Sequence, residues 1–467
     1  MKQITNEEIN EQYEYMRRVR AIIGEGKKAC VRTFGCQQNE ADSERLGGML
    51  REMGFETVCD VKQADLILVN TCAVREHAEL KALSVTGQFK HLKEAKPSLL
   101  IGICGCMVTQ EHRAGTIKHS YPYVDFLFGT AMLYRFPEIL WDTLTEEKRQ
   151  ILWEDTGEGN IAEGLPVKRE GGAKAWLSIM YGCNNFCTYC VVPYVRGRER
   201  SRRKSDVLAE ARELIADGVQ EITLLGQNVN SYGNDLGTEG DFADLLNDIC
   251  KLDGDFRIRF MTSHPKDASH KLIDVMAANE KVERHFHLPL QSGDNRVLKA
   301  MNRRYTRESY LDLVGYMREK MPEIAITTDI IVGFPGETED EFENTLDMLR
   351  RVRFDNIYSF IYSKRRGTPA EKMPDQISDA VKKERFARLL KVQDAISKEK
   401  NAELIGRRVP VLVEGRSKTD PTRLTGRTAG NRLVHFTGDD GLIGKRIELL
   451  VEDAEIHSLF GSYSPKE

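Results

Sequence analysis

The chain has 467 residues, of which 40% are hydrophobic and 30% charged, and its formal net charge is −4. This length predicts about three domains, and the slightly acidic balance excludes a protein that coats nucleic acid through its overall charge. No apolar run is long enough to span a membrane, and residues 1–20 lack the apolar core of a signal peptide, so we expect a cytoplasmic protein without membrane contact. The ten cysteines of such a protein favour metal or catalytic thiols over disulfides.

After an expected helical extension (residues 1–24), residues 25–150 repeat a strand, a cysteine-bearing turn and a helix. Helical stretches cover Asn39–Met53 and Arg75–Ala95, and strand-like runs precede three cysteines: Ala29–Gly35 before Cys36, Leu66–Thr71 before Cys72, and Leu99–Gly105 before Cys106. This alternation predicts a parallel α/β domain, in which the carboxyl edge of one sheet would gather all three thiols.

The alternative is three unrelated buried cysteines, which are common in protein cores. Cys104 could compete with Cys106, because residues i and i+2 of a strand face the same side. We assign the remaining cysteines to packing: Cys30, Cys59, Cys104 and Cys250.

Residues 151–172 are polar and glycine-rich and form the predicted linker to a second domain, residues 173–400. In that domain amphipathic helices separate six strand-like runs: Ala175–Tyr181, Glu221–Gly226, Arg257–Thr262, His285–Leu290, Ala325–Phe334 and Asn356–Tyr362. Six such units predict a partial (β/α)6 barrel, whose site lies in the loops at the carboxyl ends of the strands.

Cys183, Cys187 and Cys190 follow the first of these runs at x3 and x2 spacing. A zinc site normally closes its tetrahedron with four ligands, whereas an iron–sulfur cluster takes one thiolate per iron and tolerates a missing one. The spacing therefore predicts a cluster with one open iron, the alternatives being zinc or unreactive thiols. A dense basic run follows, for which we expect contacts with nucleic-acid phosphates rather than a merely solvated surface: Arg196, Arg198, Arg200, Arg202, Arg203 and Lys204.

A long polar helix, Ser378–Leu404, leads into residues 401–467, where short alternating segments predict a small OB-like β-barrel. The segments are Val409–Glu414, Arg423–Arg427, Leu433–Phe436 and Arg446–Val451. Basic residues outnumber acidic ones between Arg407 and Arg446, and Phe436 is available for base stacking. We interpret this barrel as an RNA-binding module, the alternative being an ordinary solvated face.

These features together resemble the methylthiotransferase branch of the radical S-adenosylmethionine (SAM) enzymes, and within it the members that modify tRNA, over nearly the whole chain. The resemblance rests on the cysteine loops and on several strand-end motifs: Gly35-Cys36-Gln37-Gln38-Asn39, Asn70-Thr71-Cys72-Ala73-Val74-Arg75-Glu76, Gly105-Cys106-Met107, Ser178 to Gly197, Leu224-Leu225-Gly226-Gln227-Asn228-Val229-Asn230, His287-Leu288-Pro289-Leu290-Gln291-Ser292-Gly293 and Ile331-Val332-Gly333-Phe334-Pro335-Gly336-Glu337-Thr338.

The resemblance implies two [4Fe-4S] clusters, an auxiliary one on Cys36, Cys72 and Cys106 and a SAM-binding one on the second trio. The C-terminal barrel corresponds to the family's TRAM domain. The implied substrate is the anticodon stem-loop of tRNA with N6-(dimethylallyl)adenosine at position 37, which becomes the 2-methylthio derivative. One SAM gives the methyl group, and a second gives the 5′-deoxyadenosyl radical that removes hydrogen from C2 of the adenine.

Such a reaction also needs an external electron donor and a sulfur source, and it needs no catalytic side chain beyond the cluster ligands, because the cofactors carry the chemistry. Expected SAM contacts are Tyr189, Gln227, Asn228, Ile331 and Gly333. Tyr189 could instead only pack. Asp329 and Gly336 depart from the common G-x-I-x-G-x-x-E pattern, so adenine contacts there are in doubt.

Three other functions stay open at this point. Two are methylthiolation of threonylcarbamoyladenosine in tRNA and of an aspartate in a ribosomal protein. The third is a non-catalytic iron–sulfur protein that binds RNA or transfers electrons.

Overall fold

The computed structural model describes residues 2–464 except 75, 147, 153–159, 170 and 238. No helix in this described part is long and apolar enough to cross a membrane. The chain divides into two compact units with interleaved segments. Unit 1 comprises Met1–Glu170, Ser178–Asn184 and Cys190–Arg202, and unit 2 comprises Gly171–Leu177, Asn185–Tyr189 and Arg203–Glu467. These boundaries differ from the five segments expected from the sequence.

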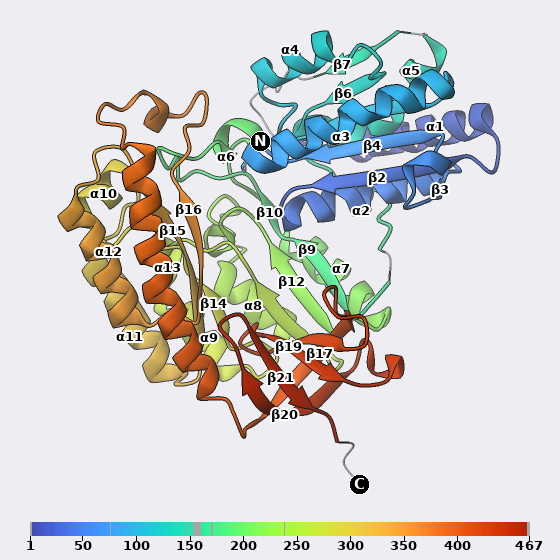
Figure 1. Ribbon diagram of the computed structural model, residues 1–467. Helices are drawn as coiled ribbons and strands as arrows, with labels where there is room; N and C mark the ends of the chain where they lie inside the picture. Colours follow the sequence, from blue (N-terminus) through green and yellow to red (C-terminus); the bar gives the residue numbers. More distant parts are fainter. Residues whose placement is uncertain are drawn as a thin grey trace. The chain divides into compact units, whose positions relative to one another are not determined.

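Unit 1 is built on a six-stranded parallel sheet with the strand order β3-β2-β4-β5-β6-β7 (Figure 1). Its strands are β2 (Lys28–Phe34), β3 (Glu56–Thr57), β4 (Leu66–Thr71), β5 (Leu100–Gly105), β6 (Phe126–Phe128) and β7 (Gln150–Leu152). The three strands expected before the cysteines are confirmed as β2, β4 and β5.

Helices cover both faces of this sheet. Apolar residues of α1 (Asn6–Ile23), α2 (Gln37–Glu52) and α5 (Phe136–Thr145) share one core with it, and those of α3 (Glu76–Ala95) and α4 (Glu111–Ser120) share the other. The helix after β2 and the helix after β4 therefore lie on opposite faces. Between these adjacent strands the winding changes direction, and ligands of doubly wound sheets bind at such a point. Arg75, the expected start of α3, lies outside the described residues.

The described part of the expected linker is structured and packs on unit 1. Its first residues complete β7, and β8 (Asn160–Ile161) pairs with β1 (Lys2–Gln3). The Tyr13 hydroxyl donates to the Gly164 carbonyl at 2.9 Å, and the Lys168 amide donates to the Glu44 carbonyl at 2.9 Å. The glycines of this segment therefore allow turns in an ordered chain and do not make it a flexible linker. Residues 153–159 and 170 of the expected linker lie outside the described part.

Unit 2 contains the six expected βα strands in two parallel sheets, β13-β12-β9 and β14-β15-β16. They are β9 (Lys174–Ser178), β12 (Glu221–Leu225), β13 (Arg257–Phe260), β14 (His285–His287), β15 (Ala325–Val332) and β16 (Asn356–Ile361). The expected run Ala175–Tyr181 breaks after Ser178 and continues as β10 (Met180–Tyr181), which pairs with β11 (Arg200–Ser201) in unit 1. A bridge between Ile258 of β13 and Val282 links the last strand of the first sheet to the segment that leads into β14 of the second.

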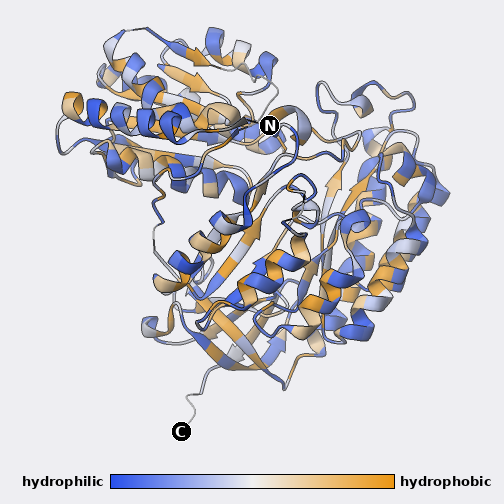
Figure 2. Ribbon diagram, turned by 180° about the vertical axis from the view of Figure 1, so that it is seen from behind, coloured by the Kyte–Doolittle hydropathy of each residue, from blue (hydrophilic) through white to orange (hydrophobic). Residues whose placement is uncertain are grey.

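The helices of the partial barrel are α7 (Lys204–Ala216), α8 (Phe242–Cys250), α9 (His270–Ala278), α10 (Asn295–Ala300), α11 (Arg307–Lys320), α12 (Glu339–Val352) and α13 (Asp379–Ala402). In Figure 2 the strands are largely hydrophobic, whereas the helices alternate hydrophobic and hydrophilic residues. This is the pattern of helices that bury one face against a sheet.

A closed five-stranded barrel ends the chain, with the order β17-β18-β19-β21-β20. Its strands are β17 (Arg408–Arg416), β18 (Leu424–Thr428), β19 (Leu433–Thr437), β20 (Arg446–Ala454) and β21 (Ser458–Ser462), the last of which the sequence pattern did not predict. Phe436 is 1% exposed and belongs to the barrel core, so the expectation that it stacks on a base is wrong. Phe436 and Val434 are two residues apart and share the inward face of β19, because successive side chains of a strand point to opposite faces.

Candidate functional site

The three cysteines of unit 1 follow strand ends that lie in register. Phe34 pairs with Thr71, and Thr71 pairs with Gly105, so each cysteine comes one or two residues beyond the same row. Gly105 has φ +98°, and a Cβ there would lie 2.4 Å from the Thr71 carbonyl oxygen. Only glycine fits this turn, which ends β5 and lets the Cys106 amide donate to the Thr71 carbonyl at 2.9 Å.

The thiols of Cys36 and Cys72 are hydrogen-bonded to each other, and the sulfur atoms of Cys72 and Cys106 also accept hydrogen bonds from nitrogen donors. A hydrogen bond from Cys72 lowers the pKa of the Cys36 thiol to about 5 and raises the pKa of Cys72 itself. The Val74 amide donates to Cys72 Sγ at 3.3 Å, and Arg196 Nε donates to Cys106 Sγ at 3.1 Å. Cys72 and Cys106 are buried, whereas Cys36 is exposed.

Three free thiols with N–H groups directed at sulfur fit a cluster, in which each thiolate binds a different iron. Among the residues that the structure describes, no group of three or more His, Cys, Asp or Glu side chains is placed to hold a single metal ion.

Two buried asparagines, which the sequence motifs include but to which we assigned no role, hold the cysteine loops together. Asn39 Nδ2 donates to Asn70 Oδ1 and to the Thr71 carbonyl, both at 3.1 Å, and Asn70 Nδ2 donates to the Asn39 carbonyl at 2.9 Å. The Asn39 side chain also accepts from the Cys36 amide at 3.3 Å. Their position three residues after Cys36 and two before Cys72 was the available signal.

The remaining cysteines divide differently from the expectation. Cys30, Cys104 and Cys250 are buried, in agreement with a packing role, but Cys59 is exposed, so packing does not explain it. Cys104 lies in the core shared by α1, α2 and α5, while Cys106 contacts Ala73, Val191 and Val195. The i, i+2 argument for competition fails because the left-handed Gly105 interrupts the strand between them.

The second trio lies in one short stretch, with Cys183 and Cys190 in segments of unit 1 and Cys187 in unit 2. Within unit 2, Asn302 Nδ2 donates to the carbonyls of Asn185 and Phe186, both at 3.0 Å, and thereby holds the loop before Cys187. Arg303, which is 5% exposed, donates from one guanidinium nitrogen to Cys187 Sγ at 3.4 Å. Arg303 is a further residue that the sequence motifs did not indicate.

Two of the expected SAM contacts share an apolar cluster in unit 2. Tyr189 and Ile331 both pack against buried side chains that include Val297 and Phe334. Gln227 and Asn228 follow the end of β12, as expected, with Gln227 half-buried and Asn228 1% exposed.

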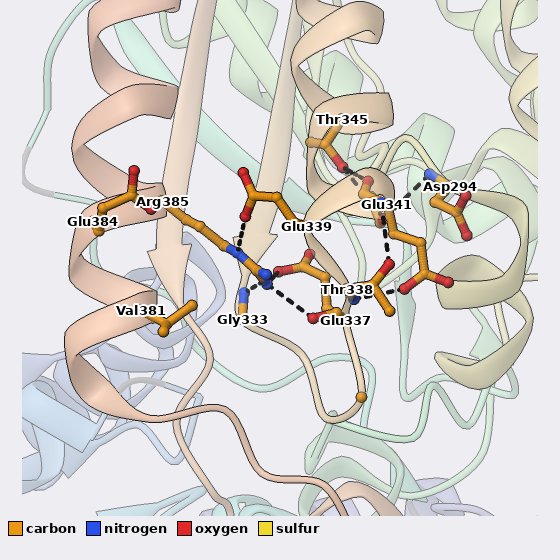
Figure 3. A network of polar contacts seen from close by, with 12 residues as sticks. Asp294, Gly333, Glu337, Thr338, Glu339, Glu341, Thr345, Val381, Glu384 and Arg385 are labelled. Carbon is orange, nitrogen blue, oxygen red and sulfur yellow. Dashed lines mark hydrogen bonds and ion pairs between the residues drawn. The ribbon is translucent and has the colours of Figure 1, made fainter.

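Gly333 lies at the end of a polar network in the turn from β15 to α12 (Figure 3). Its amide donates to Glu337 Oε2 at 2.8 Å, and Arg385 of α13 binds the same carboxylate at 3.0 Å. Burial raises the pKa of Glu337 to about 7 against the opposing effect of Arg385. Glu337 stands one residue beyond the glutamate of the G-x-I-x-G-x-x-E pattern, which is why motif matching missed it.

Among the residues that the structure describes, several buried polar side-chain atoms in the loops after β12 and β13 have no hydrogen-bond partner. They are Asn228 Oδ1, both side-chain amide atoms of Asn230, Ser263 Oγ and His264 Nε2. Burial, with Arg303 and Lys266 nearby, lowers the pKa of His264 to about 2, so its ring is neutral. The Lys266 amide donates to Nδ1 at 3.2 Å, which leaves the ring hydrogen on Nε2. Unpaired buried groups of this kind indicate a polar ligand.

The basic run after Cys190 does not form the expected phosphate surface. Arg196, Arg200 and Arg202 are 7%, 7% and 3% exposed. Arg202 binds the Glu163 carboxylate at 2.6 Å and the Ser178 carbonyl at 2.7 Å, and Arg200 binds the carbonyls of Arg196 and Arg198. These guanidinium groups stabilise the loops of unit 1, and only Arg198 and Arg203 of the run are exposed.

Comparison with known proteins agrees with this geometry. Residues 177–349 match the model of the radical SAM superfamily, residues 28–129 match an uncharacterized protein family, UPF0004, and residues 402–463 match the TRAM domain. The solved structure of the radical S-adenosylmethionine methyltransferase TsrM from Kitasatospora setae has a similar fold, with a TM-score of 0.54 and 15% identity over 74% of this chain and 77% of that one. The fold and the cysteine loops therefore define a radical SAM protein.

Closer relatives specify the family. The chain is 53% identical over 455 residues to the tRNA-2-methylthio-N(6)-dimethylallyladenosine synthase of Acetivibrio thermocellus, covering 97% of this chain and 94% of the relative. It is 51% identical over 461 residues to the protein of the same name from Thermoanaerobacter sp. (strain X514), covering 98% and 97%. The chain belongs to the family of tRNA-2-methylthio-N(6)-dimethylallyladenosine synthases.

Proposed function

We propose that this protein adds a methylthio group to C2 of N6-(dimethylallyl)adenosine at position 37 of tRNA. The observation that carries the proposal is the convergence of Cys36, Cys72 and Cys106 at one sheet edge, together with family membership over nearly the whole chain. We therefore expect the protein to act on tRNA in the cytoplasm.

We assign Cys36, Cys72 and Cys106 to an auxiliary [4Fe-4S] cluster and Cys183, Cys187 and Cys190 to the SAM-binding cluster. The two clusters, with SAM bound, would supply the methyl group, the sulfur ligand and the radical that removes hydrogen from an unactivated aromatic carbon. The protein's own part is positional. The Asn39–Asn70 hydrogen bonds fix the auxiliary loops, and Asn302 and Arg303 fix the loop around Cys187.

The SAM contacts in this proposal remain Tyr189, Gln227, Asn228, Ile331 and Gly333. The unpaired atoms of Asn228, Asn230 and His264 support a polar ligand at the ends of β12 and β13. Gly333 has φ +75°, and a Cβ there would lie 2.4 Å from Lys382 Cγ, so the turn favours glycine at this position. The electron donor and the sulfur source are external partners.

Mass spectrometry of tRNA nucleosides from cells with and without this gene tests the proposal. We expect 2-methylthio-N6-(dimethylallyl)adenosine to disappear on deletion and its unmodified precursor to accumulate, with recovery by the parent gene. Unchanged amounts of the methylthio nucleoside would rule out this substrate.

An assay of the reconstituted protein separates the alternatives. With SAM and dithionite we expect 5′-deoxyadenosine and methylthiolation of the dimethylallyladenosine stem-loop, but not of the threonylcarbamoyladenosine stem-loop or of the ribosomal protein. Absence of 5′-deoxyadenosine would support a non-catalytic iron–sulfur protein.

A further inference from the structure

Arg196 is a buried cation between a thiol and a carboxylate, all within unit 1. Its Nε donates to Cys106 Sγ at 3.1 Å, and a terminal nitrogen donates to Asp42 Oδ2 at 2.7 Å. Arg196 is 7% exposed and Asp42 5% exposed. A buried charge is tolerated only when it is paired, so Asp42 is what allows a guanidinium to lie against this sulfur.

The backbone that carries Arg196 is held by apolar contacts rather than by the charge. Arg196 ends the short helix α6 (Val192–Arg196), and Val191 and Val195 pack with Ala73 and Cys106 in one buried cluster. Asp42 comes from α2, the helix that follows Cys36. An Arg196→Gln variant therefore keeps the side chains that pack against Cys106, although it leaves the buried Asp42 carboxylate without its partner.

We propose that Arg196, oriented by Asp42, is a positioning residue that directs the Cys106 sulfur and sets the reduction potential of the cluster on Cys36, Cys72 and Cys106. The inference rests on the proposed function. A hydrogen bond and a positive charge at a ligand sulfur stabilise the more negative, reduced cluster and raise its potential. The Asp42 carboxylate opposes that charge and lowers the potential.

The two residues consequently predict shifts of opposite sign. Arg196→Gln removes the positive charge and moves the midpoint potential of this cluster to a more negative value. Asp42→Asn removes the opposing charge and moves the midpoint to a more positive value. A purely structural role would not give opposite signs, because both substitutions break the same ion pair.

Arg303 provides a matched control at the other cysteine trio. It contacts Cys187 Sγ at 3.4 Å, and its other nitrogens donate to the Pro289 carbonyl and the Tyr305 hydroxyl. In the described part of the chain, no carboxylate lies within ion-pair distance of Arg303. Arg303→Gln should therefore leave the midpoint of the Cys36, Cys72 and Cys106 cluster unchanged.

The test uses the full chain with Cys183, Cys187 and Cys190 replaced by alanine, so that only the first trio can hold a cluster. After anaerobic reconstitution, iron is counted and the midpoint is measured by electron paramagnetic resonance during a redox titration. We expect iron to be retained, a negative shift for Arg196→Gln, a positive shift for Asp42→Asn and a near-parent midpoint for Arg196→Lys.

Equal midpoints in the parent and both charge variants, or shifts in one direction, would overturn the inference. If Arg196→Gln does not hold iron, Asp42→Asn decides alone, and a midpoint equal to that of the parent overturns the inference. If the alanine parent itself binds no cluster, the cluster assignment in the proposed function fails instead.

Discussion

Which cysteine reaches the edge of the sheet depends on one left-handed residue. Gly105 turns the chain at the end of β5, so Cys104 stays in the core while Cys106 meets Arg196 beside Cys36 and Cys72. A side chain at Gly105 would collide with the Thr71 carbonyl and with Asn70. Chemistry at this edge is therefore determined by backbone conformation as much as by the thiols.

Replacing each of the two neighbouring cysteines should separate a ligand from a packing residue. We expect Cys106→Ala to lose the auxiliary cluster, so that reconstituted protein holds about half the parent's iron. Cys104→Ala should keep all its iron and lose roughly 1 kcal/mol of unfolding free energy, since it only removes buried contacts. Iron analysis and denaturant unfolding measure both, and the reverse pattern would contradict the assignment.

Arg202 and its neighbour Arg203 distinguish a structural cation from a surface cation. Arg202 is 3% exposed and pairs with Glu163, which is 26% exposed, so Arg202→Gln loses charge-assisted hydrogen bonds worth about 1.5–3 kcal/mol rather than breaking a fully buried ion pair. Arg203→Gln is the exposed control, with an expected change within about 0.5 kcal/mol. Urea unfolding gives both values. Equal stability of the two variants, with weaker tRNA binding by Arg202→Gln, would restore the phosphate interpretation.

At the scale of elements, the turn from β15 to α12 depends on a carboxylate that burial keeps difficult to ionise. The folded pKa of Glu337 is about 7, above its ordinary value of 4.5, so the native state binds this proton more tightly than the unfolded chain does. The stabilisation from this proton is complete at low pH and is lost as the pH rises through 7.

Glu337→Gln should remove that contribution while keeping the acceptor for the Gly333 amide. We expect the parent's unfolding free energy relative to the variant to fall between pH 4.5 and 7, measured by denaturant unfolding of the metal-free, reduced protein. Glu339→Gln is the control, because Glu339 is half-exposed and its pKa is lowered by Arg388. That control should stay flat between pH 4.5 and 7, because a carboxylate with a lowered pKa loses its contribution only as the pH falls below its unfolded value of 4.5, and parallel profiles for the two variants would contradict the role of burial.

The sequence predicted the long elements well because their periodicity is strong. All six strands of the partial barrel, the three strands that precede Cys36, Cys72 and Cys106, and four strands of the terminal barrel lie where the apolar runs place them. Among the strands it missed, β6 has three residues, β7 lies in a polar stretch, and β21 begins with Ser458. Their pairing is fixed by neighbours distant in the chain, which local patterns do not report.

Side-chain roles within the site were less predictable than its ligands. Spacing indicated Cys183, Cys187 and Cys190, whereas strand ends and the family resemblance indicated Cys36, Cys72 and Cys106. The residues that hold the loops, Asn39, Asn70 and Arg303, are ordinary polar types whose partners lie far away in sequence. Arg202 and Phe436 were misjudged for the same reason. Charge and aromaticity show what a side chain can do, and only the fold shows whether it is buried.

At the scale of the whole molecule, the basic character of the C-terminal barrel is largely neutralised by ion pairs. Acidic partners bind Arg416, Arg423, Arg427, Arg432 and Arg446, the last two through residues of the partial barrel. In the part of the chain that the structure describes, ion pairs do not engage Arg407, Arg408, Lys418 or Lys445, and all four are exposed. These four are the barrel's best candidates for phosphate contacts.

Arg407→Glu with Arg408→Glu should therefore weaken tRNA binding independently of the modified nucleoside. Each phosphate contact contributes about 0.7–0.9 to the slope of log affinity against log salt, so losing two should reduce the slope by about 1.4–1.8. The matched control is Arg350→Glu with Arg351→Glu, an adjacent pair on α12 in which each side chain is 54% exposed. Filter binding over a salt series gives both slopes. Equal losses in the two double variants would show that overall charge, rather than the barrel face, governs binding, because the two proteins carry the same net charge.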